Sequence, residues 1–234
     1  MRLFGIIGKP LDCSPSPKIY NAVFKKRSLP CRYLPFQVAP KHLKNLILCM
    51  KLVDVEGLNV TIPYKEAVIP FLDGLDKSAE LCGAVNTIVR RKNKFTGYNT
   101  DGAGFLVALK KNKKFSPKNK CVMIIGAGGA ARGIAAALAG AGAKEILFFN
   151  RHHGRAKKAA AFLRKNFPKT TWVASPSFAK ADLVVQATPR PLKPARKFLS
   201  RKTILFDIRT AKPEGLRMLK AQARLNLELW LGKS

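Results

Sequence analysis

The sequence predicts an α/β protein of two domains, and three observations support this fold class. Short apolar runs rich in β-branched residues alternate with helical patterns along nearly the whole chain, which is typical of parallel sheets covered by helices. A glycine-rich turn joins an apolar run to a helical pattern after Cys121. The chain has 234 residues, 47% of them hydrophobic, which is enough for one large or two small hydrophobic cores.

Strands and helices are assigned from apolar periodicity and β-branched content. The predicted strands are residues 3–8, 32–38, 57–62, 84–90, 121–126, 145–150, 182–188 and 203–208. The predicted helices are residues 17–26, 40–51, 64–72, 101–111, 130–141, 154–166 and 215–231. Residues 86–99 are predicted to form a hairpin that turns at 92–94. The domain break is placed near Asp101 to Gly104, because the pattern after Cys121 forms a separate nucleotide-binding unit.

Composition and the first residues also bear on the cellular location of the protein. No apolar run approaches the roughly 20 residues that a membrane-spanning helix needs. The first residues, MRLFGIIGKP, are broken too soon by Gly8 and Pro10 to form a signal peptide. The cysteines are odd in number, scattered and without a CxxC pair, so we expect free thiols and neither a disulfide framework nor a metal site. These features predict a soluble cytoplasmic protein.

The formal net charge of +31 raises nucleic acid binding as a rival function. Residues 1–100 hold 16 Lys/Arg against 7 Asp/Glu, a net +9, and residues 101–234 hold 28 against 6, a net +22. There is no zinc-finger spacing, no aromatic RNA-binding motif and no basic region followed by heptads. We therefore expect anionic small ligands and incidental affinity for polyanions, and we do not expect a dedicated nucleic acid partner.

The glycine-rich turn has the spacing of a dinucleotide-binding loop. Gly126 suits the tight turn, Gly128 allows close approach of a pyrophosphate, and the small Ala131 lets the following helix pack on the strand. The amino terminus of that helix then faces the phosphates. The predicted cofactor-binding residues of this turn are Gly126, Ala127, Gly128, Gly129 and Ala130.

Residues after the next strand indicate which dinucleotide binds. NAD enzymes usually place an acidic residue there to hold the ribose 2′-hydroxyl, whereas this chain has Asn150 and Arg151. A guanidinium offers charge-assisted hydrogen bonds to a 2′-phosphate, so the sequence favours NADP, with Arg155 as an assisting residue. The alternative is a surface arginine that follows a strand.

The first domain carries polar side chains suited to a hydroxylated acid. Ser14 and Ser16 lie two residues apart on an extended segment before a helix, which makes a small site for a carboxylate. Ser16 is also predicted to cap the helix opened by Pro17, and capping alone would explain it. Further polar residues follow apolar runs, where ligands bind in open α/β sheets. They are Asn59, Thr61, Asn86 and Asp101, the last of which could instead cap a helix.

One lysine stands at a junction that otherwise looks buried. In NVTIPYKE, Lys65 follows the strand 57–62, and Pro63 suits the first turn of a helix. A solvated lysine in a first helical turn is the simpler alternative.

Taken together, these stretches resemble the shikimate dehydrogenase family. The similar pieces run in family order from the first strand to the last helix: FGIIGKPLDCSPSPKIYNAVF, LNVTIPYKE, LCGAVNTIV, GYNTDGAGF, IIGAGGAARGI, NR at 150–151, ATP at 187–189 and GLRMLKAQARLNLELW.

The resemblance implies NADP-dependent interconversion of 3-dehydroshikimate and shikimate, in the pathway to aromatic amino acids. It implies that Lys65 and Asp101 are the catalytic pair and that Ser14 and Ser16 hold the substrate carboxylate. The remaining implied contacts are Asn59, Thr61, Asn86 and Gln222 with the substrate ring or its hydroxyls, and Thr188 with the cofactor. The implied organisation is a substrate domain at 1–102, an NADP-binding Rossmann domain at 103–212 and a C-terminal helix at 213–234 that returns to the substrate domain, in a monomer or homodimer.

The chain departs from the family after LFDI at 205–208, where a segment of the usual C-terminal region is shortened. Two alternatives therefore stay open. One is a quinate/shikimate dehydrogenase that accepts NAD, which Arg151 argues against. The other is a catalytically weakened relative that binds shikimate-like ligands or polyanions, which the presence of Lys65 and Asp101 argues against.

Overall fold

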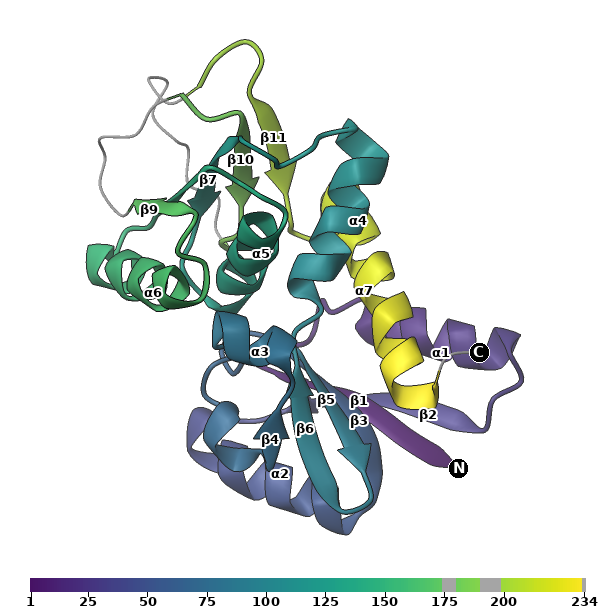
Figure 1. The fold of residues 1–234 in the computed structure, drawn as a ribbon. Coiled ribbons are helices and arrows are strands. Elements are labelled where there is room, and N and C mark those ends of the chain that lie inside the picture. Colours follow the sequence, from purple (N-terminus) through teal and green to yellow (C-terminus); the bar gives the residue numbers. More distant parts are fainter. Residues whose placement is uncertain (174–179, 190–198, 233–234) are drawn as a thin grey trace. The chain divides into compact units, whose positions relative to one another are not determined.

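The computed structural model describes residues 1–173, 180–189 and 199–232. The chain forms two compact units (Figure 1). The first contains Met1–Glu80, Ala84–Thr100 and Ala223–Ser234, and the second contains Leu81–Gly83 and Asp101–Gln222. Each unit has an α/β architecture, which confirms the predicted fold class. The domain boundaries predicted from the sequence, at residues 102 and 212, stay a prediction.

A six-stranded sheet forms the centre of the first unit, in the order β2-β1-β3-β5-β6-β4. The three strands β1 (Arg2–Gly8), β2 (Cys31–Gln37) and β3 (Val55–Val60) are parallel. The strands β5 (Thr87–Arg91) and β6 (Lys94–Tyr98) form the predicted hairpin, with Arg91 opposite Lys94, and the short β4 (Gly74–Leu75) pairs with β6. Because β5 runs antiparallel to β3, this sheet is mixed rather than purely parallel.

Both faces of the first sheet carry buried side chains. One strand contributes to both clusters, because successive side chains along a strand point to opposite faces. Ile7 of β1 packs in one cluster with Ile47 of α2 (Leu43–Leu52), which is preceded by the 3₁₀ turn η1 (Pro40–His42). Phe4 of β1 packs in a second cluster with Phe24 of α1 (Ser16–Lys26) and with Trp230.

The second unit contains a five-stranded parallel sheet in the order β11-β10-β7-β8-β9 (Figure 1). Its strands are β7 (Cys121–Ile125), β8 (Glu145–Phe149), β9 (Thr171–Val173), β10 (Leu183–Gln186) and β11 (Ile204–Asp207). Its helices include α4 (Asp101–Lys113), α5 (Gly129–Gly140) and α6 (His153–Asn166). Within the described ranges, no helix is both long enough and apolar enough to cross a membrane.

The last helix, α7 (Pro213–Leu231), contributes to both units. In the second unit, α7 lies beside α4, where a side chain at Gly104 would collide with Gln222 (Figure 1). In the first unit, Trp230 donates a hydrogen bond from Nε1 to the carbonyl of Ile88 at 3.0 Å, and a side chain at Gly57 would occupy the position of its indole ring. The C-terminal part of the helix therefore packs on the sheet of the first unit.

The predicted helix at 64–72 is wrong. This stretch forms turns that end in the 3₁₀ helix η2 (Ile69–Phe71). Pro70 explains the difference, because it lacks the N–H that an α-helix would pair with Glu66 and its ring would clash with that carbonyl. Three short elements were not predicted: β4, β9 and α3 (Lys77–Cys82).

Candidate active site

Ser14 and Ser16 follow β1 and lead into α1. The backbone N–H of Ser16 points to Ser14 Oγ at 3.4 Å, which holds the two serines together, and Ser16 is only 5% exposed. The predicted capping role of Ser16 is wrong, because α1 begins at Ser16 itself and Pro15 occupies the cap position. A role in holding an anion therefore does not compete with helix capping.

Asn59 and Asn86 are buried polar side chains on neighbouring parts of the sheet. Asn59 lies near the end of β3 and is 9% exposed, and Asn86 precedes β5 and is 4% exposed. The Asn59 side chain donates from Nδ2 to the carbonyl of Asn86 at 3.3 Å. Thr61 is half-buried just beyond β3, where its N–H donates to the carbonyl of Ile7 at 2.9 Å. The structure thus brings three predicted substrate residues to one region of the first unit.

Lys65 lies in the turn after β3 and is half-buried. Its carbonyl accepts a hydrogen bond from the N–H of Val85 at 2.7 Å, and Val85 directly precedes Asn86. Tyr64 beside it is buried in the core. A backbone hydrogen bond and a buried neighbour therefore hold the lysine near Asn86, although the segment is not the helix that was predicted.

Asp101 and Gln222 belong to the second unit, and the structure pairs them directly. Gln222 Nε2 donates to Asp101 Oδ1 at 2.9 Å, and Gln222 is 8% exposed and Asp101 2%. Asp101 is the first residue of α4, where the positive end of the helix dipole favours a carboxylate. This is a buried acceptor group with a fixed orientation.

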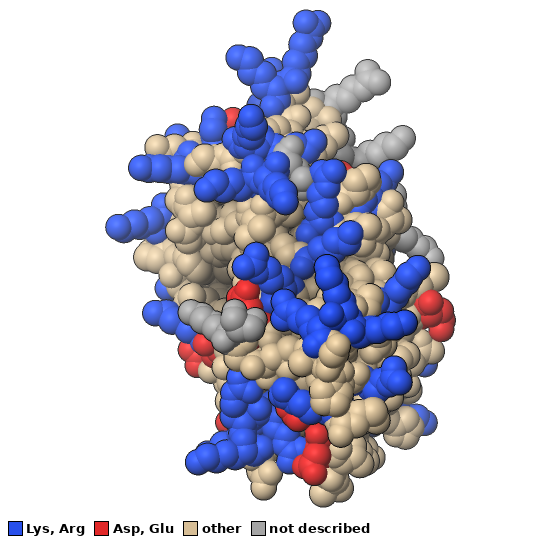
Figure 2. Space-filling model, turned by 90° about the vertical axis from the view of Figure 1, so that its right-hand side faces the viewer, with Lys and Arg blue, Asp and Glu red and all other residues tan. Residues whose placement is uncertain are grey.

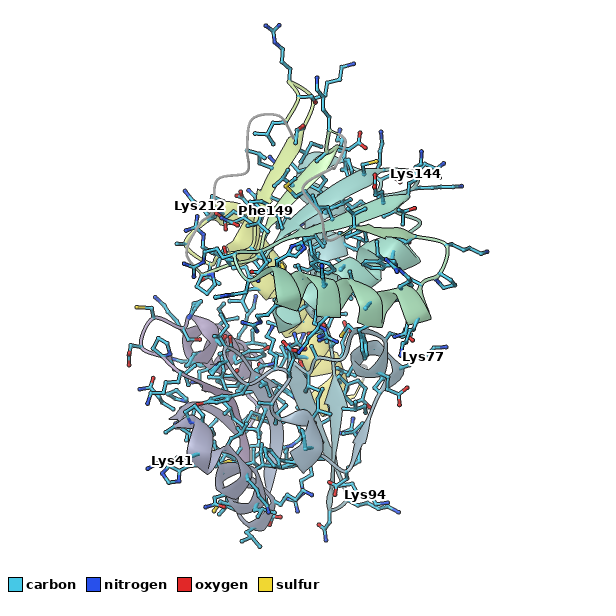
Figure 3. All side chains as sticks on the ribbon, turned by 90° about the vertical axis from the view of Figure 1, so that its left-hand side faces the viewer. Lys41, Lys77, Lys94, Lys144, Phe149 and Lys212 are labelled. Atoms are coloured by element: carbon cyan, nitrogen blue, oxygen red, sulfur yellow. The ribbon has the colours of Figure 1, made fainter. Side chains whose placement is uncertain are left out.

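The glycine turn between β7 and α5 has the backbone that its sequence predicts. Gly126 has φ +115°, a conformation that residues with side chains rarely adopt, and its N–H donates to the carbonyl of Phe149 at 2.8 Å (Phe149 is labelled in Figure 3). Gly128 precedes α5 in an extended conformation, and a Cβ built there would meet nothing within 4 Å. Ala131 is fully buried.

These features fit a dinucleotide. The open space over Gly128 admits a pyrophosphate close to the backbone, and the first turn of α5 contains no acidic residue that would repel it. Thr188, beyond β10, lies beside the turn, since a Cβ on Gly126 would be 3.0 Å from Thr188 Cγ2. The glycine turn, Phe149 and Thr188 thus lie together at the carboxyl ends of β7, β8 and β10.

The segment after β8 is strongly basic. Arg151 and Arg155 are exposed, and the Asn150 side chain donates from Nδ2 to the carbonyl of His152 at 3.0 Å, which shapes the turn into α6. The sequence has no Asp or Glu between Glu145 and Asp182. An additional phosphate group would therefore meet cations here and no nearby acid along this segment.

Sequence reasoning missed a set of buried polar residues that surround Asn59 and Asn86. Tyr33 Oη donates to Asn59 Oδ1 at 2.7 Å, and Asn226 of α7 bonds the side chains of Thr87 and Thr100. They lie in separate segments of the chain, so the sequence carries no spacing that would mark them as a group. In the part of the chain that the structure describes, no group of three or more His, Cys, Asp or Glu residues is arranged to hold a metal ion.

Two family models match the chain. Residues 6–88 match the model described as shikimate dehydrogenase substrate binding domain. Residues 108–208 match the model described as shikimate / quinate 5-dehydrogenase. Together these matches cover most of the sequence.

Individual proteins show the same similarity. The shikimate dehydrogenase (NADP(+)) of Desulforamulus reducens is 36% identical over 259 residues, which covers 97% of this chain and 89% of the relative. Shikimate 5-dehydrogenase from Thermus thermophilus, solved with NADP(H) and shikimate, has a TM-score of 0.83 and 28% identity, covering 100% of this chain and 94% of that one. The 5-ketofructose reductase of Gluconobacter sp. strain CHM43 has a TM-score of 0.85 and 32% identity, with coverage of 100% and 94%. Because the fold alone is shared by proteins with different names, the substrate has to be argued from the site.

Proposed function

The chain belongs to the shikimate dehydrogenase family, and on this premise we propose how its residues perform the NADP-dependent interconversion of 3-dehydroshikimate and shikimate. It is an oxidoreductase that acts on a CH–OH group and takes NADP as its cofactor. Its place is the shikimate pathway, which leads to aromatic amino acids.

One observation carries the proposed site: a set of polar side chains that are at most a tenth exposed in a largely apolar interior. They are Ser16, Asn59 and Asn86 in the first unit and Asp101 and Gln222 in the second. Burying polar groups costs free energy unless they pair with each other or with a polar ligand. A small acid with several hydroxyls is such a ligand.

We assign the substrate contacts by chemistry. The hydroxyls of Ser14 and Ser16 donate to the substrate carboxylate, because both are held at the start of α1. The side chains of Asn59, Thr61, Asn86 and Gln222 bind the ring hydroxyls. Asp101 accepts a hydrogen bond from a substrate hydroxyl while Gln222 holds its carboxylate in place.

Lys65 and Asp101 form the proposed catalytic pair. The bound NADPH supplies the hydride that reduces the ketone. Reduction leaves negative charge on the former carbonyl oxygen, which the Lys65 ammonium stabilises and protonates from Nζ. In the oxidation of shikimate, the neutral amine accepts the proton of the alcohol, and Asp101 orients that hydroxyl.

The proposed cofactor site uses the glycine turn and the basic segment after β8. Gly126, Ala127, Gly128, Gly129 and Ala130 line the pyrophosphate, and Thr188 lies beside them. Asn150, Arg151 and Arg155 bind the 2′-phosphate. We further propose a cytoplasmic location and a monomer or homodimer, and no dedicated nucleic acid partner.

The first test is a rate assay that follows the nicotinamide absorbance with shikimate or quinate, each combined with NADP or NAD. We expect the shikimate and NADP pair to give the highest kcat/KM. Preference for quinate with NAD would contradict the proposed specificity, and lack of shikimate oxidation would contradict the function.

The same assay tests Lys65. We expect Lys65→Ala to lower kcat by about 10²- to 10⁴-fold, because general acid–base catalysis contributes that much. The affinity for NADP, measured by fluorescence titration, should stay nearly unchanged. Lys41→Ala is the matched control, since Lys41 is an exposed lysine of the same unit. A Lys65→Ala variant with the turnover of the wild type would remove Lys65 from the mechanism.

A further inference from the structure

A buried polar network in the first unit connects the C-terminal helix to the proposed substrate residues. All of its members are at most 9% exposed. They are Tyr20, Tyr33, Asn59, Asn86, Thr87, Thr100 and Asn226. Asn59 and Asn86 are proposed substrate contacts, whereas the other members have no assigned role.

Asn226 of α7 lies where several of these bonds meet. It is 2% exposed, and its Oδ1 accepts hydrogen bonds from Thr87 Oγ1 and Thr100 Oγ1, both at 2.9 Å. Its Nδ2 donates to Tyr20 Oη at 2.8 Å. A single amide therefore joins two threonine hydroxyls and a phenol.

Thr100 connects Asn226 to Asn86 through its hydroxyl and its backbone N–H. Thr100 accepts a bond at Oγ1 from Asn86 Nδ2 at 3.0 Å and donates its N–H to Asn86 Oδ1 at 2.8 Å. The Thr100 hydroxyl has one hydrogen of its own, and Asn226 Oδ1 at 2.9 Å is a nearer acceptor than Asn86 Oδ1 at 3.2 Å. With Asn226 present, Thr100 bonds both Nδ2 and Oδ1 of Asn86, while its hydroxyl hydrogen goes to Asn226 and leaves Asn86 Oδ1 without that additional bond.

Thr87 also connects Asn226 to Asn86 through its hydroxyl. Its Oγ1 lies 2.9 Å from Asn86 Oδ1 and 2.9 Å from Asn226 Oδ1, and it accepts a bond from Asn59 Nδ2 at 3.3 Å. Since a hydroxyl has one hydrogen, Thr87 shares it between the two amides. Removal of the Asn226 acceptor would shift both threonine hydroxyls toward Asn86.

The tyrosines fix the opposite end of the network. Tyr20 and Tyr33 stack with their ring centroids 4.4 Å apart, and Tyr33 Oη donates to Asn59 Oδ1 at 2.7 Å. Burial raises the pKa of both phenols, so both keep their protons at neutral pH. Tyr33 donates to Asn59, whereas the Tyr20 oxygen accepts from Asn226. Asn59 and Asn226 are thus each held by a protonated phenol.

We propose that Asn226 is a positioning residue for the substrate: through Thr87 and Thr100 it fixes the amide of Asn86 in the orientation that binds a shikimate hydroxyl. This inference rests on the proposed function. It assigns a role in substrate recognition to a residue of α7 whose side chain bonds Thr87, Thr100 and Tyr20.

The test is Asn226→Leu, which keeps the number and branching of the side-chain heavy atoms and removes both the acceptor and the donor. We expect KM for shikimate to rise about ten-fold, because both threonine hydroxyls would then bond Asn86 and disturb the orientation of its amide. KM for NADP should change less than about two-fold, because the change lies in the network around Asn86. Asn226→Asp keeps an oxygen acceptor for both threonines, so we expect it to restore KM for shikimate to within about three-fold of the wild type.

Leu227→Ala is the control for loss of packing. Leu227 is the next residue of α7, 6% exposed in the hydrophobic cluster with Phe4, and has no polar side-chain atoms. It should lower Tm and leave KM for shikimate unchanged. Thr100→Val provides a second route to the same readout should Asn226→Leu not fold. It should also raise KM for shikimate, and combining it with Asn226→Leu should raise KM by less than the product of the two single effects.

The outcomes separate the two claims. A wild-type chain that does not oxidise shikimate overturns the proposed function and the inference with it. An active wild type whose Asn226→Leu and Thr100→Val variants keep the wild-type KM for shikimate overturns the inference alone, as does a Leu227→Ala variant that raises KM as much as Asn226→Leu does.

Discussion

Arg151 is the first exposed residue after β8 and the side chain to which we assign the preference for NADP. Its neighbours His152, His153 and Arg155 are also exposed, and the sequence offers no acid until Asp182. A ribose 2′-hydroxyl would find no carboxylate partner here, whereas a 2′-phosphate would find cations. We therefore attribute the proposed selectivity to the positive charge at the end of one strand.

We expect Arg151→Ala to raise KM for NADP about 10- to 100-fold, because a hydrogen bond between charged groups contributes about 1.5–3 kcal/mol. KM for NAD should stay nearly the same, since NAD has no 2′-phosphate. Initial rates with each cofactor at saturating shikimate measure the ratio. Lys169→Ala, an exposed cation beyond α6, should not alter it. An unchanged ratio in Arg151→Ala would contradict the 2′-phosphate assignment.

Residues whose proposed role comes from their own chemistry could be selected from the sequence. The glycines of the turn, Arg151 and the serine pair were selected by spacing and residue type, and Lys65 and Asp101 were selected by resemblance; their roles stay predictions. Asn226 and Tyr20 were not predicted, because their hydrogen bond joins residues 206 positions apart. A buried asparagine has meaning only through its partners, and one sequence does not show which residues meet in the interior.

At the scale of elements, long periodic segments were predicted well and short ones were not. The helices α1, α4, α5, α6 and α7 lie within two residues of their predicted bounds. The two-residue β4, the three-residue β9 and the six-residue α3 are too short to show a period. The stretch 64–72 was wrong because Pro70 outweighs an apolar pattern that otherwise suits a helix.

The β7–turn–α5 element allows folding and cofactor binding to be separated by mutation. At Gly128 an added methyl group enters open space, so Gly128→Ala should fold with nearly unchanged Tm but hinder the approach of the pyrophosphate. We expect KM for NADP to rise about ten-fold or more, the effect of losing roughly 1.4 kcal/mol of binding. Thermal unfolding and cofactor titration measure the two effects.

Gly126→Ala is the matched comparison. Its φ of +115° is strained for alanine, and the new Cβ would lie 3.0 Å from Thr188 Cγ2, so this variant should lose about 1–3 kcal/mol of stability. If Gly128→Ala instead bound NADP as the wild type does, the pyrophosphate would not pass over Gly128.

At the scale of the whole molecule, charge is the most unusual property. Figure 2 shows Lys and Arg spread over the face in view, with few Asp or Glu among them. The formal net charge is +31. Both the substrate and the cofactor are anions. A strongly positive protein attracts such ligands from a distance.

We therefore expect kcat/KM for NADP to fall about ten-fold as ionic strength rises from about 0.01 M to about 0.3 M, because salt shortens the range of the attraction. The kcat at saturating ligand should change little. Stopped-flow binding and steady-state rates in NaCl measure this, with sucrose as an uncharged control. A flat salt profile would mean that the surface charge has no part in ligand capture.

The packing of Trp230 has a consequence for how the chain is made. Its indole covers Phe4 and Tyr20, with ring centroids 5.1 Å and 5.3 Å apart, and so closes a cluster begun by the first strand and first helix. A ribosome exports those early segments long before the residue that covers them. Until α7 has been translated, the nascent amino-terminal segments therefore expose this hydrophobic surface and are prone to aggregate. The hydrophobic cluster is completed only when Trp230 packs on it.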